Sequence, residues 1–463
     1  CRVVDTTQAA PNTTVCPVCA GMPGTLPVVN QKAVEYGIKV ALALECEIQR
    51  TSIFARKNYF YPDLPKGYQI SQYEYPLAVR GSMVVDTSEG EHVIRVTRVH
   101  LEEDTGKLTH VHNNGEDYSL VDLNRAGVPL LEIVSEPDMH SIEDVRGYAT
   151  NLRAIVRELG VNSGDMEKGV IRFEANVSLR PAGSQQLGTR VEIKNLNSFR
   201  AMERAILFEV ERQTQLLDAG EAVLQETLGW DEASQTTHSQ RSKEEAHDYR
   251  YFPEPDLPPL VVEPEWVEKI RAGLPELPRA KAKRFSQAYD LAPVEAMLLV
   301  SERETAIFFE ETIRHLRTVP ARTAYAWLTG EVFAWMRQTG EPFTGLKITP
   351  EMLADLLESV QGGVINQNTG KAVLAEMLQS GQPAEEIIQR DGLAQVSDSE
   401  FISSLISKVL MEHPDELLSY RSGKISLANW FFGQVMKAAG GKANPAVLRK
   451  ELEKQLQTNS SQI

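Results

Sequence analysis

The sequence predicts an α+β protein in which a front half built on antiparallel strands is followed by an all-helical region. Residues 171–180 alternate apolar and polar side chains, and residues 190–199 alternate again after a turn-rich stretch, as in an antiparallel hairpin. From about residue 276 onward, one helical period follows another. The composition, with 42% hydrophobic and 24% charged residues, is ordinary for a folded globular protein.

The individual elements follow from local signals along the chain. Asn30 can cap a helix that runs to about Glu47, and Ser141 with Asp144 resembles a capping box at the start of a helix that Gly160 stops. Between these helices, "EHVIRVTRVHLEED" alternates well enough for a strand that ends in three carboxylates. Four later segments show a start residue, apolar spacing and a stop, and predict helices: 349–363, 370–381, 399–414 and 444–457.

A chain of 463 residues has room for about three domains. We place them at residues 1–275, 276–395 and 396–463, with a break near "GLAQVSD". The net charge of −16 argues against a protein that holds nucleic acid by bulk charge, although basic residues in the last domain suit a contact with phosphate. No apolar run is long enough to cross a bilayer and no secretory signal is evident, so we expect an intracellular, cytoplasmic protein that does not contact a membrane.

Two segments combine aromatic residues with prolines, at 56–72 ("RKNYFYPDLPKGYQISQ") and at 248–260 ("DYRYFPEPDLPPL"). The first has no usable period, and its prolines would break a helix or a strand. We expect an ordered loop that is held down by its rings while Lys57, Asp63 and Lys66 point at polar groups. The alternative is a packed surface loop without a function.

Carboxylates gather at two places in the front half. Glu102, Glu103 and Asp104 end the strand over residues 91–104, and adjacent carboxylates repel unless a cation, a shared proton or solvent compensates. Magnesium is a natural compensator, because it prefers oxygen ligands and often bridges to phosphate. The polar face of the predicted hairpin adds Glu174, Glu192 and Lys194. Glu103, Glu174 and Glu192 together predict a magnesium and phosphoryl site; the alternative for the hairpin is a surface ladder of ion pairs.

Cys16 and Cys19 have C-x-x-C spacing, and Cys1 precedes them. Three thiolates predict a structural zinc site that still needs a fourth ligand, and the alternative is buried free cysteines. The sequence has no P-loop, no G-x-S-x-G elbow and no H-E-x-x-H motif, so nucleotide use cannot be predicted from local motifs.

Several long motifs carry a resemblance that spans nearly the whole chain. "HLEEDTGK", "DLNRAGVPLLEIVSEPD", "EANVSLRP", "KNLNSF" and "GQVMKAAGGKANP", together with the two aromatic segments, resemble the B subunits of the bacterial and organellar aspartyl/glutamyl-tRNA amidotransferases. The resemblance implies an antiparallel-sheet cradle domain, a helical domain and a small YqeY-like helical tail. It also implies a heterotrimer in which an amidase A subunit releases ammonia from glutamine and a small C subunit ties the other two together.

Members of that family take up Glu-tRNA(Gln) or Asp-tRNA(Asn), activate the side-chain carboxylate with ATP and Mg²⁺, and let ammonia attack the acyl phosphate. Carried over to this sequence, the resemblance implies catalytic roles for Lys57, Glu103, Glu174, Glu192 and Lys194. The family's N-terminal strand, which supplies a glutamate and a histidine, has no counterpart here. Two rival hypotheses remain: a non-catalytic tRNA-binding scaffold of the same complex, and a metal-dependent hydrolase of small carboxylate derivatives.

Overall fold

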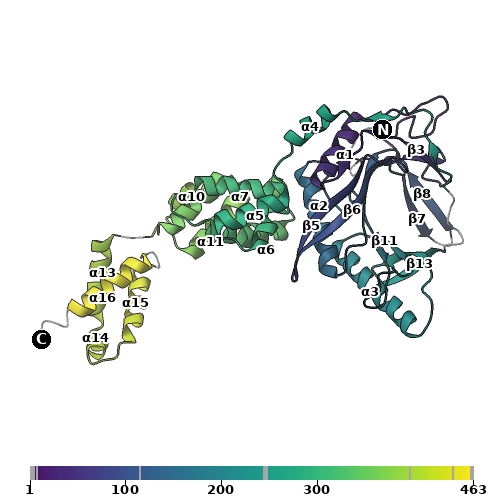
Figure 1. Ribbon diagram of the computed structural model, residues 1–463. Coiled ribbons are helices and arrows are strands. Elements are labelled where there is room, and N and C mark those ends of the chain that lie inside the picture. The colour runs from purple at the N-terminus through teal and green to yellow at the C-terminus, as the bar shows by residue number, and fades with distance from the viewer. Residues whose placement is uncertain are drawn as a thin grey trace. The chain divides into compact units, whose positions relative to one another are not determined.

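The computed structural model describes residues 6, 9–113, 116–242, 249–395, 398–440 and 443–458. The chain divides into two units: Cys1–Lys281 with Val300–Glu302 form the first, and Ala282–Leu299 with Arg303–Ile463 form the second. The first unit contains the strands and the second is helical (Figure 1), which confirms the predicted α+β class. The three-domain division at residues 275 and 395 stays a prediction.

A seven-stranded antiparallel sheet is the centre of the first unit. Its order is β1-β5-β6-β4-β3-β14, and β9 also pairs with β6. The strands are β1 (Glu47–Ile48), β3 (Ala55–Asn58), β4 (Tyr68–Ser71), β5 (Ala78–Thr87), β6 (Gly90–Glu103), β9 (Pro129–Ser135) and β14 (Phe252–Pro253). Two small sheets accompany it: β2 (Thr51–Ser52) with β15 (Leu260–Val261), and β7 (Lys107–Asn113) with β8 (Glu116–Asp122).

Helices α1 (Gln31–Ala43) and α2 (Ile142–Glu158) bury apolar side chains of this sheet, including Val99 and Leu101 of β6. Both predicted caps are present. Asn30 accepts hydrogen bonds from the first-turn backbone of α1, and Ser141 with Asp144 forms the capping box of α2. Because side chains alternate along a strand, the neighbours of the buried residues project from the opposite face of the sheet.

A second sheet has the order β10-β11-β12-β13. Its strands are β10 (Phe173–Val177), β11 (Val191–Leu196), β12 (Glu226–Asp231) and β13 (Thr236–Ser242), and α3 (Phe199–Asp218) packs on it through a buried core. The β10–β11 pair is antiparallel, which confirms the predicted hairpin. The β11–β12 pair is parallel and departs from the otherwise antiparallel pattern of the described strands.

The remaining secondary-structure elements of the described chain are helices. Helix α4 (Pro264–Ala272) belongs to the first unit. Helix α5 (Pro278–Tyr289) begins in the first unit and continues in the second from Ala282. Next along the chain is α6 (Pro293–Val300), whose last residue belongs to the first unit. The second unit continues with α7 (Arg303–His315), α8 (Ala321–Trp327), a π-helical segment (Leu328–Val332), α9 (Phe333–Thr339), a 3₁₀ turn (Phe343–Gly345), α10 (Pro350–Gln361), α11 (Gln367–Ser380), α12 (Ala384–Arg390), α13 (Ser399–Glu412), α14 (Pro414–Arg421), α15 (Leu427–Ala438) and α16 (Pro445–Thr458). The last four share one buried apolar core. Within the described residues, every helix is too short or too polar to span a membrane.

Candidate active site

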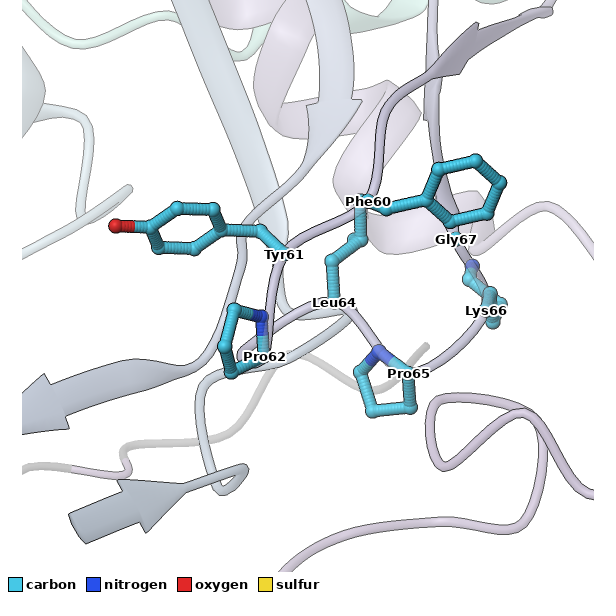
Figure 2. Close-up of a pocket in the computed structure, with 7 residues that line it drawn as sticks. All are labelled: Phe60, Tyr61, Pro62, Leu64, Pro65, Lys66 and Gly67. Carbon is cyan, nitrogen blue, oxygen red and sulfur yellow. The ribbon is translucent and has the colours of Figure 1, made fainter. Parts of the chain in front are cut away.

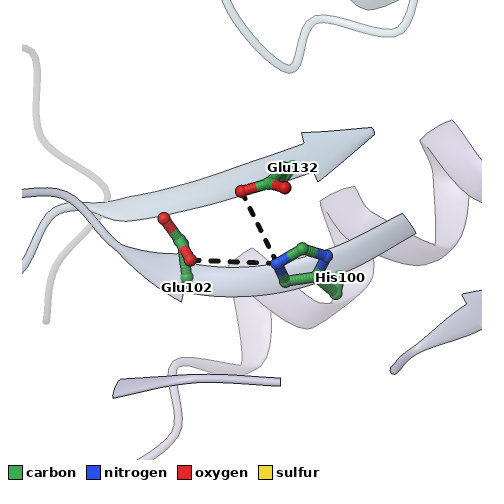
Figure 3. Close-up of side chains that lie close together, drawn as sticks. All are labelled: His100, Glu102 and Glu132. Carbon is green, nitrogen blue, oxygen red and sulfur yellow. Dashed lines mark ion pairs between the residues drawn. The ribbon is translucent and has the colours of Figure 1, made fainter. Parts of the chain in front are cut away.

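A histidine and two glutamates meet on the sheet face that points away from α1 and α2. His100 on β6 is directly opposite Glu132 on β9, and Glu102 follows two residues after His100 on the same face. The Nε2 atom of His100 lies 3.8 Å from a carboxylate oxygen of each glutamate (Figure 3). In the described part of the chain, this is the one group of three or more histidine, cysteine or acidic residues whose ligand atoms lie within 4.8 Å of one another.

The register of the sheet surrounds this group with polar side chains from β3 and β4. Ser71 Oγ donates a hydrogen bond of 2.9 Å to Glu102 Oε2, and Gln69 Nε2 donates one of 2.9 Å to Glu102 Oε1. Lys57 is paired with Gln69 and therefore projects from the same face. Burial raises the pKa of Glu102, but the contact with His100 and the positive charge of Lys57 outweigh it and leave that pKa below its usual value. Glu102 is therefore ionised at neutral pH.

These residues fit a divalent cation. Two carboxylates and one imidazole offer the hard oxygen ligands that Mg²⁺ prefers, plus one nitrogen, and leave positions for water or phosphate oxygens. Glu102 is almost fully buried, whereas 44% of the Glu132 side chain is exposed, so one side of the group is open to a ligand. We call these three residues the acidic triad.

A second charged cluster lies on the β10–β11 hairpin, where the sequence predicted it. Lys194 Nζ lies 3.2 Å from Glu174 Oε1 and 3.8 Å from Glu192 Oε1, and Thr227 donates a hydrogen bond of 2.9 Å to Glu192. Burial and the neighbouring charge of Glu192 raise the pKa of Glu174 despite the attraction of Lys194. Burial lowers the pKa of Lys194, but the charges of Glu174 and Glu192 outweigh it and raise that pKa. Half of the Glu174 side chain is exposed, so solvent screens this ion pair.

Glu103 does not join these clusters. It alternates with Glu102 along β6, pairs with Lys66, and accepts a hydrogen bond of 3.2 Å from the backbone N–H of Ile70. Among the described residues, Glu103, Glu174 and Glu192 do not form a group with ligand atoms within 4.8 Å, so the predicted magnesium ligand set is not assembled. The physical reason is that Glu174 and Glu192 lie on the β10–β11 hairpin of the second sheet, whereas Glu103 ends β6 of the first sheet and pairs there with Lys66.

Sequence reasoning missed His100, Glu102 and Glu132 as a set. Two-residue alternation within "RVHLEED" places His100 and Glu102 on one face, and that signal was present in the sequence. Glu132 could not be found in this way, because its position depends on the register between β6 and β9.

The first aromatic–proline segment consists of β3, a loop over residues 59–67, and β4. Lys66 forms an ion pair with the carboxylate of Glu103, which confirms the prediction that Lys66 points at a polar group. The expectation that the rings hold the loop down is wrong for two of them: Phe60 is 91% and Tyr61 55% exposed, and both rings point outward beside a shallow hollow of about 400 Å³ (Figure 2). Tyr59 does anchor the loop, by donating a hydrogen bond of 3.1 Å to Gln69 Oε1.

Cys16 and Cys19 form a close pair with sulfur atoms 3.3 Å apart. Burial raises the pKa of Cys16, but hydrogen bonds from Cys19 outweigh it and lower that pKa, whereas burial raises the pKa of Cys19 to about 12. The pair lines a mostly apolar cavity of about 360 Å³ that Glu102 and Glu103 also border. Cys1, the third predicted zinc ligand, lies outside the described residues.

Comparison with known proteins identifies the family. Residues 1–268 match the model of the GatB/GatE catalytic domain, and residues 307–456 match the GatB domain model named GatB_Yqey. The B subunit of the aspartyl/glutamyl-tRNA(Asn/Gln) amidotransferase of Myxococcus xanthus is 48% identical over 97% of this chain and 93% of its own length. Its namesake from Moorella thermoacetica is 47% identical over 96% of this chain and 93% of its own length. The chain therefore belongs to the family of aspartyl/glutamyl-tRNA(Asn/Gln) amidotransferase B subunits, components of a ligase-type amidotransferase complex.

Proposed function

We propose that this protein activates the side-chain carboxylate of Glu-tRNA(Gln) or Asp-tRNA(Asn) with ATP and lets ammonia convert it to the amide. The observation that carries the proposal is the acidic triad, which lies beside Lys57 on one face of the sheet. A carboxylate is a poor acyl donor because its leaving group would be oxide, so the reaction needs a better leaving group. Phosphoryl transfer depends on positioning and on cations rather than on a protein nucleophile.

The proposed reaction consists of two displacement steps, one at phosphorus and one at carbon. A carboxylate oxygen of the aminoacyl group attacks the γ-phosphorus of ATP, and ADP leaves. Ammonia then attacks the acyl carbon, phosphate leaves, and the nitrogen loses a proton to give the amide. A cradle that excludes water protects the acyl phosphate from hydrolysis before ammonia arrives.

Each residue has a role that follows from its contacts. His100, Glu102 and Glu132 would hold Mg²⁺, which neutralises phosphate charge when bound. The ammonium groups of Lys57 and Lys194 stabilise the charge that develops on the transferred phosphoryl group. Glu174 and Glu192 hold Lys194 in place through their ion pairs. Glu103 would not hold the ion, because its carboxylate is paired with Lys66.

The partners and the zinc site complete the proposal. We infer an amidase A subunit as the ammonia source, a small C subunit in the same heterotrimer, and the misacylated tRNA as substrate, held partly by residues 396–463. Cys16 and Cys19, with Cys1, would supply three ligands of a structural Zn²⁺, because two neighbouring thiols at C-x-x-C spacing match its preference for sulfur. We also propose a cytoplasmic location, because the protein would act in translation.

The test is a reconstituted three-subunit complex with each misacylated tRNA, ATP and Mg²⁺. Transfer of the γ-phosphate to aminoacyl-tRNA should be lost in Glu132→Gln, while glutaminase activity of the amidase persists. Glu136→Gln is the matched control, since Glu136 follows β9 and its carboxylate accepts a hydrogen bond from Thr97, away from the triad. If Glu132→Gln transfers phosphate normally, the non-catalytic tRNA-binding scaffold becomes the better account.

A further inference from the structure

Residues 249–254 form a short segment, here called the tyrosine strap, that is fixed along the edge of the seven-stranded sheet. The backbone N–H of Asn58 donates a hydrogen bond of 2.9 Å to the carbonyl oxygen of Tyr249. At the other end, Arg56 donates two hydrogen bonds of 2.8 Å to the fully buried carboxylate of Glu254. The strap therefore has a defined position on β3, the strand that carries Lys57.

The ring of Tyr249 contacts Lys57 and is itself held by other rings. The Nζ atom of Lys57 lies 5.0 Å from the ring centroid, within the range of a cation–π interaction. Tyr59 and Tyr251 meet the ring edge-on, with centroids 5.8 Å and 6.1 Å away. Tyr251 in turn stacks on Tyr73, with centroids 4.2 Å apart and planes 7° apart. The orientation of the Tyr249 ring is thus set from three sides.

Tyr249 also lies near the second charged cluster. The phenol of Tyr249 contributes to raising the pKa of Lys194. The positive charge of Lys57 contributes to lowering the pKa of Glu102. The ring of Tyr249 therefore contacts a lysine that projects from the sheet face of the acidic triad. Among the described tyrosines, Tyr59 also has its ring near Lys57, but its centroid lies 6.0 Å from Nζ, compared with 5.0 Å for Tyr249.

We propose that Tyr249 is a positioning residue that holds the ammonium group of Lys57 against the acidic triad. The catalytic consequence of this inference rests on the proposed function. The contact between the Tyr249 ring and Lys57, by contrast, can be tested on this chain alone. The side chain acts through its ring, so Tyr249→Phe keeps the interaction and Tyr249→Leu removes it.

The geometric part can be tested by NMR of the full chain with ¹³C-methylated lysines, assigned with Lys57→Arg and Lys194→Arg. Tyr249→Leu should reduce the ring-induced shift of the Lys57 signal, because the ring of Tyr59 remains at 6.0 Å, whereas Tyr249→Phe should keep the Lys57 signal in place. The chain offers a matched control: Tyr36 on α1 has Lys32 at 4.8 Å and Lys39 at 5.9 Å from its ring. Tyr36→Leu should move only the signals of Lys32 and Lys39. An unchanged Lys57 signal in Tyr249→Leu overturns the proposal.

The catalytic part is tested in the three-subunit complex. Tyr249→Leu should lower kcat for phosphorylation of the aminoacyl-tRNA by about tenfold, with the KM for tRNA changed by less than about threefold, and Tyr249→Phe should restore kcat. A loss in KM alone, or the same loss in the Phe and Leu variants, overturns the positioning role. A wild-type complex that transfers no phosphate defeats the proposed function instead, and the NMR result still decides whether Tyr249 holds Lys57.

Discussion

His100 and Glu132 are directly opposite each other on β6 and β9, so an imidazole and a carboxylate from segments about thirty residues apart in sequence meet on one face of the sheet. Glu102 shares that face and Glu103 does not. Glu102→Gln should therefore reduce ATP-dependent phosphorylation by about 10²-fold or more, and Glu103→Gln by less than about tenfold. Single-turnover transfer from labelled ATP to aminoacyl-tRNA measures both. The reverse order of effects would return Glu103 to the metal site.

The ion pair between Lys66 and Glu103 is nearly buried, with 7% and 12% of the two side chains exposed. Lys66→Met should lower the free energy of unfolding by about 3 kcal/mol, because it leaves a buried carboxylate without its partner. The double variant Lys66→Met, Glu103→Leu should recover most of that loss. Urea unfolding, with hydrogen exchange of the β4 and β6 amides as a local probe, measures both effects. Equal losses in the single and double variants would show that the pair itself stabilises the fold.

The Arg56–Glu254 pair should make the stability of the first unit depend on pH. Burial raises the pKa of Glu254, but the hydrogen bonds from Arg56 outweigh it and hold that pKa below its usual 4.5. A carboxyl whose pKa is lowered by folding stabilises the protein above its unfolded pKa, and this contribution is lost as the pH falls through the lower folded value. Glu254→Gln should flatten the dependence of urea unfolding on pH below about 4.5. A slope identical to that of the wild type contradicts the assignment.

The raised pKa of Glu174 should depend on Glu192. Like charges disfavour ionisation, so Glu192→Gln should lower the pKa of Glu174 and let its carboxylate pair with Lys194 at lower pH. A ¹³C NMR titration of the Glu174 side-chain carboxyl follows this directly. Lys194→Met is the opposing variant, because loss of the positive charge should raise the pKa of Glu174 further. A Glu174 titration that both variants leave unchanged would exclude the coupling.

Elements with local signals could be predicted from the sequence. The capping box of Ser141 and Asp144 marks the start of α2, and the alternation over residues 171–180 marks β10, because both patterns depend on neighbours in the sequence. The parallel β11–β12 pair could not be predicted, since it joins strands separated by the whole of α3.

The site was predicted in part for the same reason. Glu174, Glu192 and Lys194 lie together because a hairpin brings them together locally, as its alternation indicated. The triad requires the long-range pairing of β6 with β9, which nothing near His100 encodes. Phe60 shows a different limit: an apolar ring in a loop predicts burial on average, yet 91% of this residue is exposed.

The most direct test of the central claim is Mn²⁺ binding to the chain in the presence of a non-hydrolysable ATP analogue, followed by EPR, with Mg²⁺ as competitor. The account predicts one bound ion that Glu132→Gln weakens by about tenfold or more and that Glu136→Gln leaves unchanged. Binding that survives in Glu132→Gln and in Glu102→Gln at wild-type strength would contradict it.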